Sequence, residues 1–339
     1  MSVRPRTPVH NRPRGALRRA GVLAPLAIAL AVVAAGVASA EPPAAVTALT
    51  ATDAARAGVA ISLFRHPELD PGLVEVQLAG TTAPGRVLAV APDGATAAVT
   101  DRIDLVQATL SLARKDGSQL RLGMPGLLAA AFAPDGSWLA VIDGAGALWR
   151  VIAASGAAAR LADGPFLGPL TVEPDGTVLL AAVSSVEAPF ISRLVRFDPA
   201  APSVSRLSED KLVYGSTLLA DGSIAVIAHE PAGMVVNLLT PAGTRRLADL
   251  GPGAIHVSVS SDAGRIAWER HGDGVYLLEP PTGSARRIAS GSHPRLSTDG
   301  KSLLVVDGGG TVLLGLDGSR LARFSGHAAF AGCGWGCRP

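Results

Sequence analysis

The chain contains 339 residues, of which 48% are hydrophobic, 4% aromatic and 17% charged, with 39 glycines, 25 prolines and 2 cysteines. So much apolar content with so few ionic groups excludes an intrinsically disordered protein, and two cysteines are too few for a disulfide-stapled scaffold or a multi-cysteine zinc module. A formal net charge of +2 gives no electrostatic basis for nucleic-acid binding.

Residues 1–40 have the order of a signal peptide. Six arginines and no acidic residue precede an uncharged Ala-, Val- and Leu-rich stretch over residues 21–37, and the small residues Ala38, Ser39 and Ala40 follow it. This pattern predicts cleavage after Ala40. The alternative is an uncleaved membrane anchor, because roughly 17–20 apolar residues can span a bilayer. In both cases we expect the rest of the chain outside the cytoplasm, as a secreted, periplasmic or cell-surface protein.

Removal of this segment changes the sign of the net charge. The remaining chain has 24 basic and 28 acidic residues, which gives a net charge of −4. The basic character of the whole sequence therefore belongs to the predicted signal, and we expect no nucleic-acid partner. Contact with a membrane is expected only if the N-terminal segment is retained.

The rest of the chain is built from a repeat. An apolar run, a turn containing Asp and Gly, a second apolar run, a loop, a third run and a short fourth run recur about every 41 residues. This period and this strand content are typical of a four-stranded β-propeller blade. The aspartates of the six turns are Asp93, Asp135, Asp175, Asp221, Asp262 and Asp299.

The ends of the repeat region predict how the ring closes. Six complete units lie between about residues 86 and 325. Residues 58–85 resemble the second, third and fourth strands of a blade, and residues 326–332 resemble a first strand without successors. Together they predict a seventh, composite blade that removes exposed sheet edges. The alternative is six blades with a loose N-terminal hairpin. The predicted organisation is a linker over residues 41–57, an all-β propeller over residues 58–332 and a cysteine-containing tail over residues 333–339.

Two stretches resemble known propeller families. The sequence APDGSWLAVIDGAGALWRV (residues 133–151) resembles blades of WD-repeat and TolB-like proteins, and SSDAGRIAWERHGDGVYLLEPPTG (residues 260–283) resembles the TolB-like type more closely. The Trp-Asp dipeptide of WD repeats is absent, and only Ser325-Gly326-His327 matches their Gly-His pair. The resemblance implies a binding or scaffolding platform, and for TolB-like proteins an envelope location.

The histidines are the main candidates for a ligand-binding site. The repeat assignment places all six that follow the predicted signal in, or next to, the connections between second and third strands and between successive blades. These connections share one face of a propeller, and the carboxylates of Glu230, Glu269, Asp273 and Asp70 are expected nearby. The candidate ligand-face residues are His66, His229, His256, His271, His293, His327, Glu230 and Asp273.

Two interpretations of these side chains are open. In the first, they are the ordinary polar content of solvated loops, and no catalytic residue, metal ligand or cofactor is assigned. In the second, the imidazoles hold a divalent metal or act in acid–base catalysis on a small cyclic substrate. The sequence lacks the G-x-S-x-G, G-x-G-x-x-G and H-E-x-x-H motifs that would point to other chemistries.

Cys333 and Cys337 enclose a Gly-Trp-Gly sequence near the C-terminus. In an oxidising compartment this spacing favours a small disulfide that fixes the tail. A redox pair, a metal-binding pair or free thiols are the alternatives.

The sequence thus predicts an exported, non-catalytic propeller that binds a protein or another ligand of the cell envelope or exterior. The alternative function is a propeller hydrolase or lyase that uses the loop histidines and a divalent metal.

Overall fold

The turns found in the sequence join the first and second strands of six antiparallel sheets. In each turn, one side-chain oxygen of the aspartate accepts a hydrogen bond from the backbone N–H two residues later, as Asp135 does from Ser137 at 3.0 Å. Glycine follows the aspartate in five turns with a positive φ, a conformation that costs glycine nothing. In the fifth turn Ala263 takes this place with a φ of 55°.

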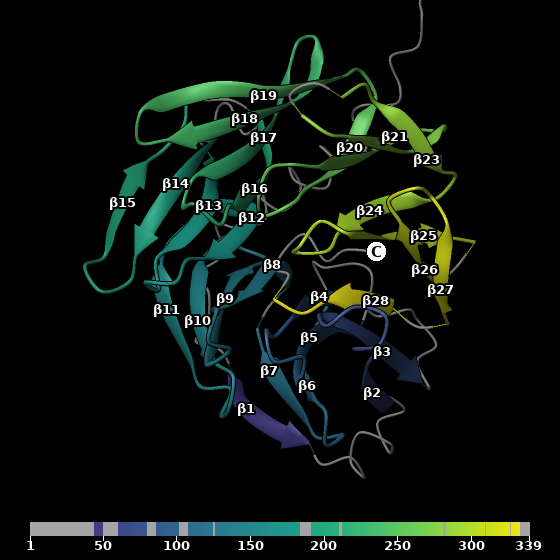
Figure 1. Cartoon of the computed structure of the whole chain (residues 1–339). Helices are drawn as coiled ribbons and strands as arrows, with labels where there is room; N and C mark the ends of the chain where they lie inside the picture. Colours follow the sequence, from purple (N-terminus) through teal and green to yellow (C-terminus); the bar gives the residue numbers. More distant parts are fainter. Residues whose placement is uncertain are drawn as a thin grey trace, which may run out of the picture.

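The computed structural model describes residues 44–49, 60–79, 86–101, 108–124, 126–183, 191–209, 212–280, 283–308, 310–325 and 327–332. Within these residues every regular element is a strand, so they include no helix that could cross a membrane. The strands form seven sheets around a ring (Figure 1). This architecture confirms the predicted seven-bladed, all-β propeller.

The first three blades follow one another in the chain, and within each blade the strands run from the inside of the ring outward. Their strands are β4 (Arg86–Val90), β5 (Thr96–Thr100), β6 (Leu110–Arg114) and β7 (Gln119–Gly123); β8 (Leu127–Phe132), β9 (Trp138–Asp143), β10 (Leu148–Ile152) and β11 (Ala158–Ala162); β12 (Phe166–Val172), β13 (Val178–Val183), β14 (Ser192–Asp198) and β15 (Ser203–Arg206).

The next three blades have the same order. Their strands are β16 (Leu212–Leu218), β17 (Ile224–Glu230), β18 (Gly233–Thr240) and β19 (Gly243–Gly251); β20 (Ala254–Val259), β21 (Ile266–Arg270), β22 (Gly274–Leu278) and β23 (Arg286–Ala289); β24 (Ser292–Leu296), β25 (Ser302–Asp307), β26 (Gly310–Gly315) and β27 (Arg320–Phe324).

The seventh blade is composite and closes the ring. It consists of β2 (Ala60–Arg65), β3 (Leu73–Ala79) and β28 (His327–Phe330), in the order β2-β3-β28. Residues 58–85 were predicted to supply the second, third and fourth strands in chain order, which would put their first apolar run beside the C-terminal strand, and this order is wrong. β28 pairs with β3, and Phe330 lies opposite Leu73.

Burial explains which N-terminal strand takes the inner place. Leu73, Val74 and Val76 of β3 are fully buried between the neighbouring blades, whereas Phe64 of β2 is 45% exposed. A strand with large apolar side chains on both faces gains most from a position that is covered on both sides. The composite blade therefore places β3 next to β28 and leaves β2 outside.

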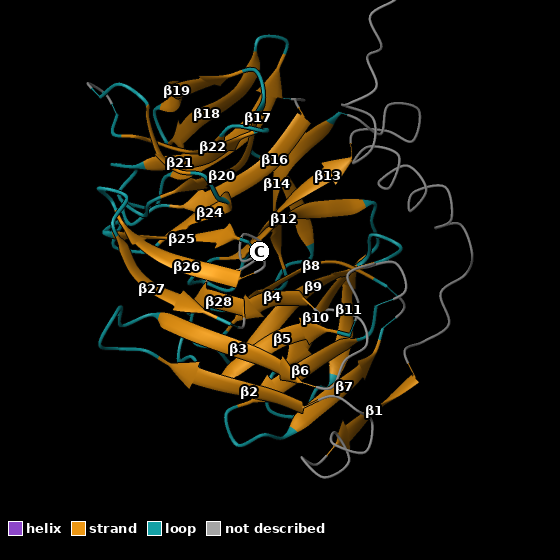
Figure 2. Cartoon of the chain, turned by 90° about the vertical axis from the view of Figure 1, so that its right-hand side faces the viewer, coloured by secondary structure: helices purple, strands orange, loops and turns teal. Residues whose placement is uncertain are grey.

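One strand comes from the segment that was predicted to be a linker. β1 (Ala44–Leu49) pairs antiparallel with β7 and adds a fifth strand to the outer edge of the first blade (Figure 2). Pairing covers an edge that would otherwise present free N–H and C=O groups. The predicted signal peptide and the predicted disulfide of Cys333 and Cys337 lie outside the described residues.

Apolar side chains fill the spaces between neighbouring blades. One buried cluster joins Trp138 and Ile142 of the second blade to Phe166 and Leu180 of the third. Another joins Leu304 of the sixth blade to Leu73 of the composite blade. Each blade thus depends on both neighbours, and the ring positions polar side chains of its inner strands with little freedom.

Candidate metal centre

The inner strand of each regular blade is interrupted at an equivalent place. The pairing register between the first and second strands shifts once in all six regular blades. In the fifth blade the shift includes His256, and in the sixth it includes His293. A bulge of this kind turns a side chain away from the regular pleat.

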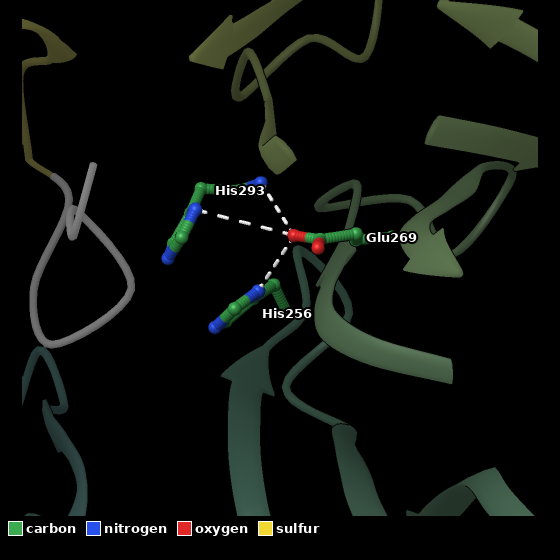
Figure 3. Close-up of side chains that lie close together, drawn as sticks. All are labelled: His256, Glu269 and His293. Carbon is green, nitrogen blue, oxygen red and sulfur yellow. Dashed lines mark hydrogen bonds and ion pairs between the residues drawn. The ribbon is translucent and has the colours of Figure 1, made fainter. Parts of the chain in front are cut away.

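The backbone at both histidines has an unusual conformation. His256 has a φ of 49° and His293 a φ of 52°, and both lie in the left-handed region. Among residues with a side chain, histidine is one of the types enriched in this region, although the conformation still costs on the order of 1 kcal/mol. Equivalent bulges in adjacent blades place the two imidazoles face to face. Their rings stack with centroids 3.8 Å apart and planes inclined by 23° (Figure 3).

Glu269 of β21 joins the two histidines. One carboxylate oxygen, Oε2, lies 2.9 Å from Nδ1 of His256 and accepts a hydrogen bond from the backbone N–H of His293 at 3.1 Å. The same oxygen lies 4.0 Å from Nδ1 of His293. Both Nδ1 atoms therefore face Glu269, and the other ring nitrogens point away from it (Figure 3).

The carboxylate of Glu269 is half-buried and ionised. Burial alone would raise its pKa, but the hydrogen bonds from His256 and from the His293 backbone, together with the charge of the two imidazoles, outweigh burial. The net result is a pKa below the ordinary value of a glutamate. At neutral pH the cluster therefore offers one anionic oxygen donor and two imidazoles.

These three side chains have the composition of a metal site. One donor atom from each residue lies within 4.8 Å of the others. Two imidazoles and a carboxylate suit divalent transition-metal ions such as Zn²⁺, Mn²⁺ and Fe²⁺. The donors come from β20, β21 and β24, so two blades that are held together by the core contribute to one cluster.

The stacked rings limit how an ion can enter. The lone pair of an imidazole nitrogen lies in the plane of its ring, and a ligated ion sits about 2.0–2.1 Å from that nitrogen. Planes inclined by only 23° at a centroid separation of 3.8 Å do not meet at such a point. Both imidazoles can ligate one ion only after one of the rings rotates, and Glu269 provides an oxygen for either arrangement.

The other predicted histidines do not join the cluster. His229 is the penultimate residue of β17, and its ring lies 6.4 Å from that of Tyr214. His271 lies exposed between β21 and β22, and His327 begins β28. The structure contradicts the predicted position of His66. It lies in the loop that joins β2 to β3, and this loop reaches the turns on the opposite face. Arg65 donates to the carbonyl of Asp93, and Asp70 accepts a hydrogen bond from Ser302.

His66 is placed there by the reversed order of the N-terminal strands. Because β3 takes the second position in its blade, the preceding loop lies with the turns between first and second strands. The His66 ring lies 3.3 Å from Glu68 and 3.2 Å from Glu75, measured between its nitrogens and the carboxylate oxygens. His66 thus makes local contacts and is separate from His256 and His293.

The predicted carboxylates Glu230 and Asp273 have partners in the outer strands. Arg246 of β19 donates to Glu230 at 2.7 Å, and Arg287 of β23 donates to the backbone carbonyl of Asp273 and lies 3.5 Å from its carboxylate. These contacts connect the end of the second strand to the fourth strand of the same blade. The two acids therefore hold blade edges together.

Glu269 is not among the ligand-face residues predicted from the sequence. It was noted only as a nearby acid, because the strand assignment gives no signal that the bulges bring two inner strands to its carboxylate. No pattern in the sequence marks Arg295, two residues after His293 on β24. Burial lowers the pKa of Arg295 to about 10, which indicates a poorly hydrated guanidinium.

Two cavities lie elsewhere in the described residues. One, of about 400 Å³, lies between the fifth and sixth blades and is lined by Ile288, Val305 and Arg320 among others. The other, of about 310 Å³, lies where inner strands end near the turns, and its lining includes Phe132 and Leu170. Neither includes His256, Glu269 or His293. The cluster is therefore described by its donor atoms.

Comparison with known proteins supports the fold. No family model and no curated protein sequence matches the chain. An oligogalacturonate lyase in complex with manganese matches with a TM-score of 0.57 and 13% identity over 83% of this chain and 86% of that chain. The oligogalacturonate lyase of Vibrio parahaemolyticus matches with a TM-score of 0.58 and 12% identity over 84% of this chain and 87% of that one.

A third solved structure, hydrazine synthase of Kuenenia stuttgartiensis, matches with a TM-score of 0.52 and 16% identity over 70% of this chain and 78% of that chain. At such identities the likeness concerns the fold alone. The chain therefore has a seven-bladed β-propeller fold shared with solved propeller proteins, and the resemblance to TolB-like and WD-repeat families stays a prediction.

Proposed function

We propose that the protein binds one divalent transition-metal ion through His256, Glu269 and His293, and that this metal centre carries its function. The observation behind this proposal is the convergence of two imidazoles and one ionised carboxylate within 4.8 Å. The manganese in a solved propeller of similar fold adds support, because it shows that such a ring is compatible with a bound metal. This proposal favours the second interpretation of the histidines.

The chain's own groups have separate roles in such a centre. Glu269 supplies negative charge, holds the Nδ1 edge of His256 and fixes the backbone of His293. The two bulges lie on adjacent inner strands, and the imidazoles that they carry stack on one another. When bound, a divalent ion acts as a Lewis acid for a ligand oxygen. A half-buried carboxylate and rigid inner strands would keep the donor set in place while a ligand binds.

Metal binding is tested on the protein lacking residues 1–40 and treated with a chelator. Titration with Mn²⁺, followed by calorimetry or by the electron paramagnetic resonance of free Mn²⁺, gives stoichiometry and affinity. We expect one ion per chain, and a loss of affinity of at least about 100-fold in His293→Ala, because one of three protein ligands is removed. His271→Ala is the matched control, since His271 is exposed and outside the cluster.

A lyase activity is the second candidate function. The support is that two solved structures of similar fold, each covering more than four-fifths of this chain, are oligogalacturonate lyases. Elimination on a uronate removes the proton next to the carboxylate, breaks the C–O bond at the adjacent carbon, forms a C=C bond and transfers a proton to the leaving oxygen. The product absorbs in the ultraviolet, so oligogalacturonate with Mn²⁺ is a direct assay. Binding without any product would favour a non-catalytic ligand-binding propeller.

Export and an envelope or extracellular protein partner are also proposals, supported by the arginine-rich N-terminus and the apolar stretch that follows it. Mass spectrometry of the exported protein tests export and cleavage, and a mature chain that begins at Glu41 is expected. Retention of residues 1–40 on a membrane-bound product would instead indicate an anchor. Crosslinking in cells followed by identification of the crosslinked chain tests the partner.

A further inference from the structure

Arg295 has an unusual environment for an arginine on an inner strand. Its Nη1 donates a hydrogen bond of 3.3 Å to the carbonyl of Pro294, and its Nε is buried without an acceptor in the described part of the chain. Arg196, by comparison, has a carboxylate partner: its Nε and Nη2 both donate to the buried carboxylate of Glu173. No carboxylate of the described residues forms an ion pair with Arg295.

The register of β24 indicates the direction of the Arg295 side chain. Arg295 lies opposite Leu304, and cross-strand partners project from the same face of a sheet. Leu304 packs with Leu73 and Phe330 of the composite blade. Arg295 therefore projects toward the composite blade, whereas the ring of His293 stacks on His256 of the preceding blade.

The two side chains are close along the strand. Two residues of extended chain span at most about 7 Å. The inner strand β24 thus presents an imidazole of the candidate metal centre on one flank and a guanidinium on the other. Arg295 is only partly buried as a whole residue, so part of its surface is accessible.

A buried, unpaired cation is unfavourable in a folded protein. Burial removes water from the Nε of Arg295, and because no acceptor of the described residues lies within hydrogen-bond distance, the lost hydrogen bond of this atom is not replaced. A buried guanidinium is stabilised when an anion accepts its hydrogen bonds. The planar fork of arginine matches the two oxygens of a carboxylate. Within the described residues no carboxylate pairs with Arg295, and such an environment suits an anionic ligand.

We propose that Arg295 binds the carboxylate of a small organic acid or sugar acid on the inner side of β24. A carboxylate is favoured over a phosphate because Arg295 contributes one positive charge and one planar fork, whereas a phosphate dianion needs further cations or backbone N–H groups. This inference deepens the proposed function by naming the chemical class of its ligand. It concerns a residue outside the metal-ligand set, and its test separates the two.

The test compares galacturonate, a sugar with one carboxylate, with galactose, its neutral counterpart. Binding of both to the chelator-treated protein is measured by calorimetry, and again after addition of Mn²⁺. We expect galacturonate to bind at least about 10-fold more tightly than galactose in the metal-free protein. Arg295→Met should remove this preference, and Arg295→Lys, which keeps the charge but not the fork, should retain part of it. Arg245→Met, at an exposed arginine of the outer strand β19, is the control.

Thermal unfolding provides a readout that a purely structural arginine would not give. Without ligand, Arg295→Met should melt at the same or a higher temperature than the parent protein, because it removes a cation whose buried Nε has no acceptor in the described residues. Galacturonate should raise the melting temperature of the parent and leave that of Arg295→Met unchanged. An unchanged preference for galacturonate in Arg295→Met would overturn the proposal, and so would tighter binding of inorganic phosphate than of galacturonate by the parent.

The outcomes also separate this proposal from the metal centre. Arg295-dependent binding of galacturonate in a protein that binds no Mn²⁺ would refute the proposed metal centre and support the carboxylate site. Mn²⁺ binding with no preference between galacturonate and galactose would support the metal centre and refute the carboxylate site.

Discussion

The rings of His256 and His293 stack at a centroid distance of 3.8 Å, although 37 residues separate them in the chain. The contact exists because β20 and β24 are the inner strands of adjacent blades and carry equivalent bulges. Glu269 accepts hydrogen bonds from both residues, one from a side chain and one from the backbone. The repeat therefore creates a polar cluster from positions that are equivalent in the two units.

Glu269→Gln should distinguish a metal-ligating carboxylate from a purely structural one. Glutamine retains the size and one acceptor oxygen but removes the charge. We expect Mn²⁺ affinity to fall by about 10- to 100-fold, with a melting temperature within a few degrees of the parent value. Calorimetric titration and thermal unfolding measure the two effects. Unchanged Mn²⁺ affinity would show that the carboxylate only orients the histidines.

Glu230→Gln should leave metal binding unchanged, because Glu230 pairs with Arg246 at the blade edge. Both partners are partly exposed, so the loss of stability should stay below about 1 kcal/mol. Mn²⁺ titration and urea unfolding of the same preparation test this assignment. A loss of Mn²⁺ binding in Glu230→Gln would indicate that Glu230 takes part in metal binding.

Asp143→Ala should destabilise the second blade strongly. Its carboxylate is buried and accepts hydrogen bonds from the backbone of Ala145 and Ala147 and from the indole of Trp149 at 2.7 Å. Removal leaves three donors without an acceptor, and we expect a loss of about 2–4 kcal/mol. Asp135→Ala, in an exposed turn of the same blade, should cost less than half as much. Equal losses in urea unfolding would contradict the account.

Stability should fall in acid because of the turn aspartates. Hydrogen bonds from Ser297 and from the Lys301 backbone are the main causes that lower the pKa of Asp299 to about 2. A depressed pKa in the folded state means that the ionised form adds stability above the ordinary value of about 3.9, and that this contribution is lost as the pH falls toward 2. Urea unfolding from pH 7 to pH 2.5 should show this loss. In Asp299→Asn the decrease between pH 4 and pH 2.5 should be smaller.

Ring closure is tested at Phe330, which is 4% exposed and packs on Leu73 and Leu304. Phe330→Ala should cost about 3–5 kcal/mol, because it opens a cavity in the contact between the composite and sixth blades. Phe64→Ala is the control, since Phe64 of β2 is 45% exposed. Similar urea midpoints for the two variants would mean that β28 does not close the ring.

Much of the fold follows from local sequence. The Asp-Gly turns determine where first and second strands meet, because aspartate caps the turn and glycine accepts a positive φ. The solitary run at residues 326–332 predicts a first strand without successors, which must pair with a strand from elsewhere in the chain. The order of the N-terminal strands was wrong because β2 and β3 are both apolar, and only packing between blades reveals which is fully covered.

The candidate site was less predictable. The sequence predicts histidines in, or next to, the connections on one face, but nothing in it marks the bulges or the positive φ values that bring the rings of His256 and His293 together. Glu269 lies in an ordinary strand pattern. Arg295 is equally inconspicuous, because the lack of an acceptor for a buried guanidinium is a property of the assembled ring.

The central claim is that His256, Glu269 and His293 form one metal site. The most direct measurement is the Mn²⁺ stoichiometry of the chelator-treated protein, compared with that of the His256→Ala variant and of the His229→Ala control. The account predicts one ion per chain in the parent and in His229→Ala, and none in His256→Ala at the same Mn²⁺ concentration. Absence of bound Mn²⁺ in the parent, or equal binding in all three proteins, would contradict it.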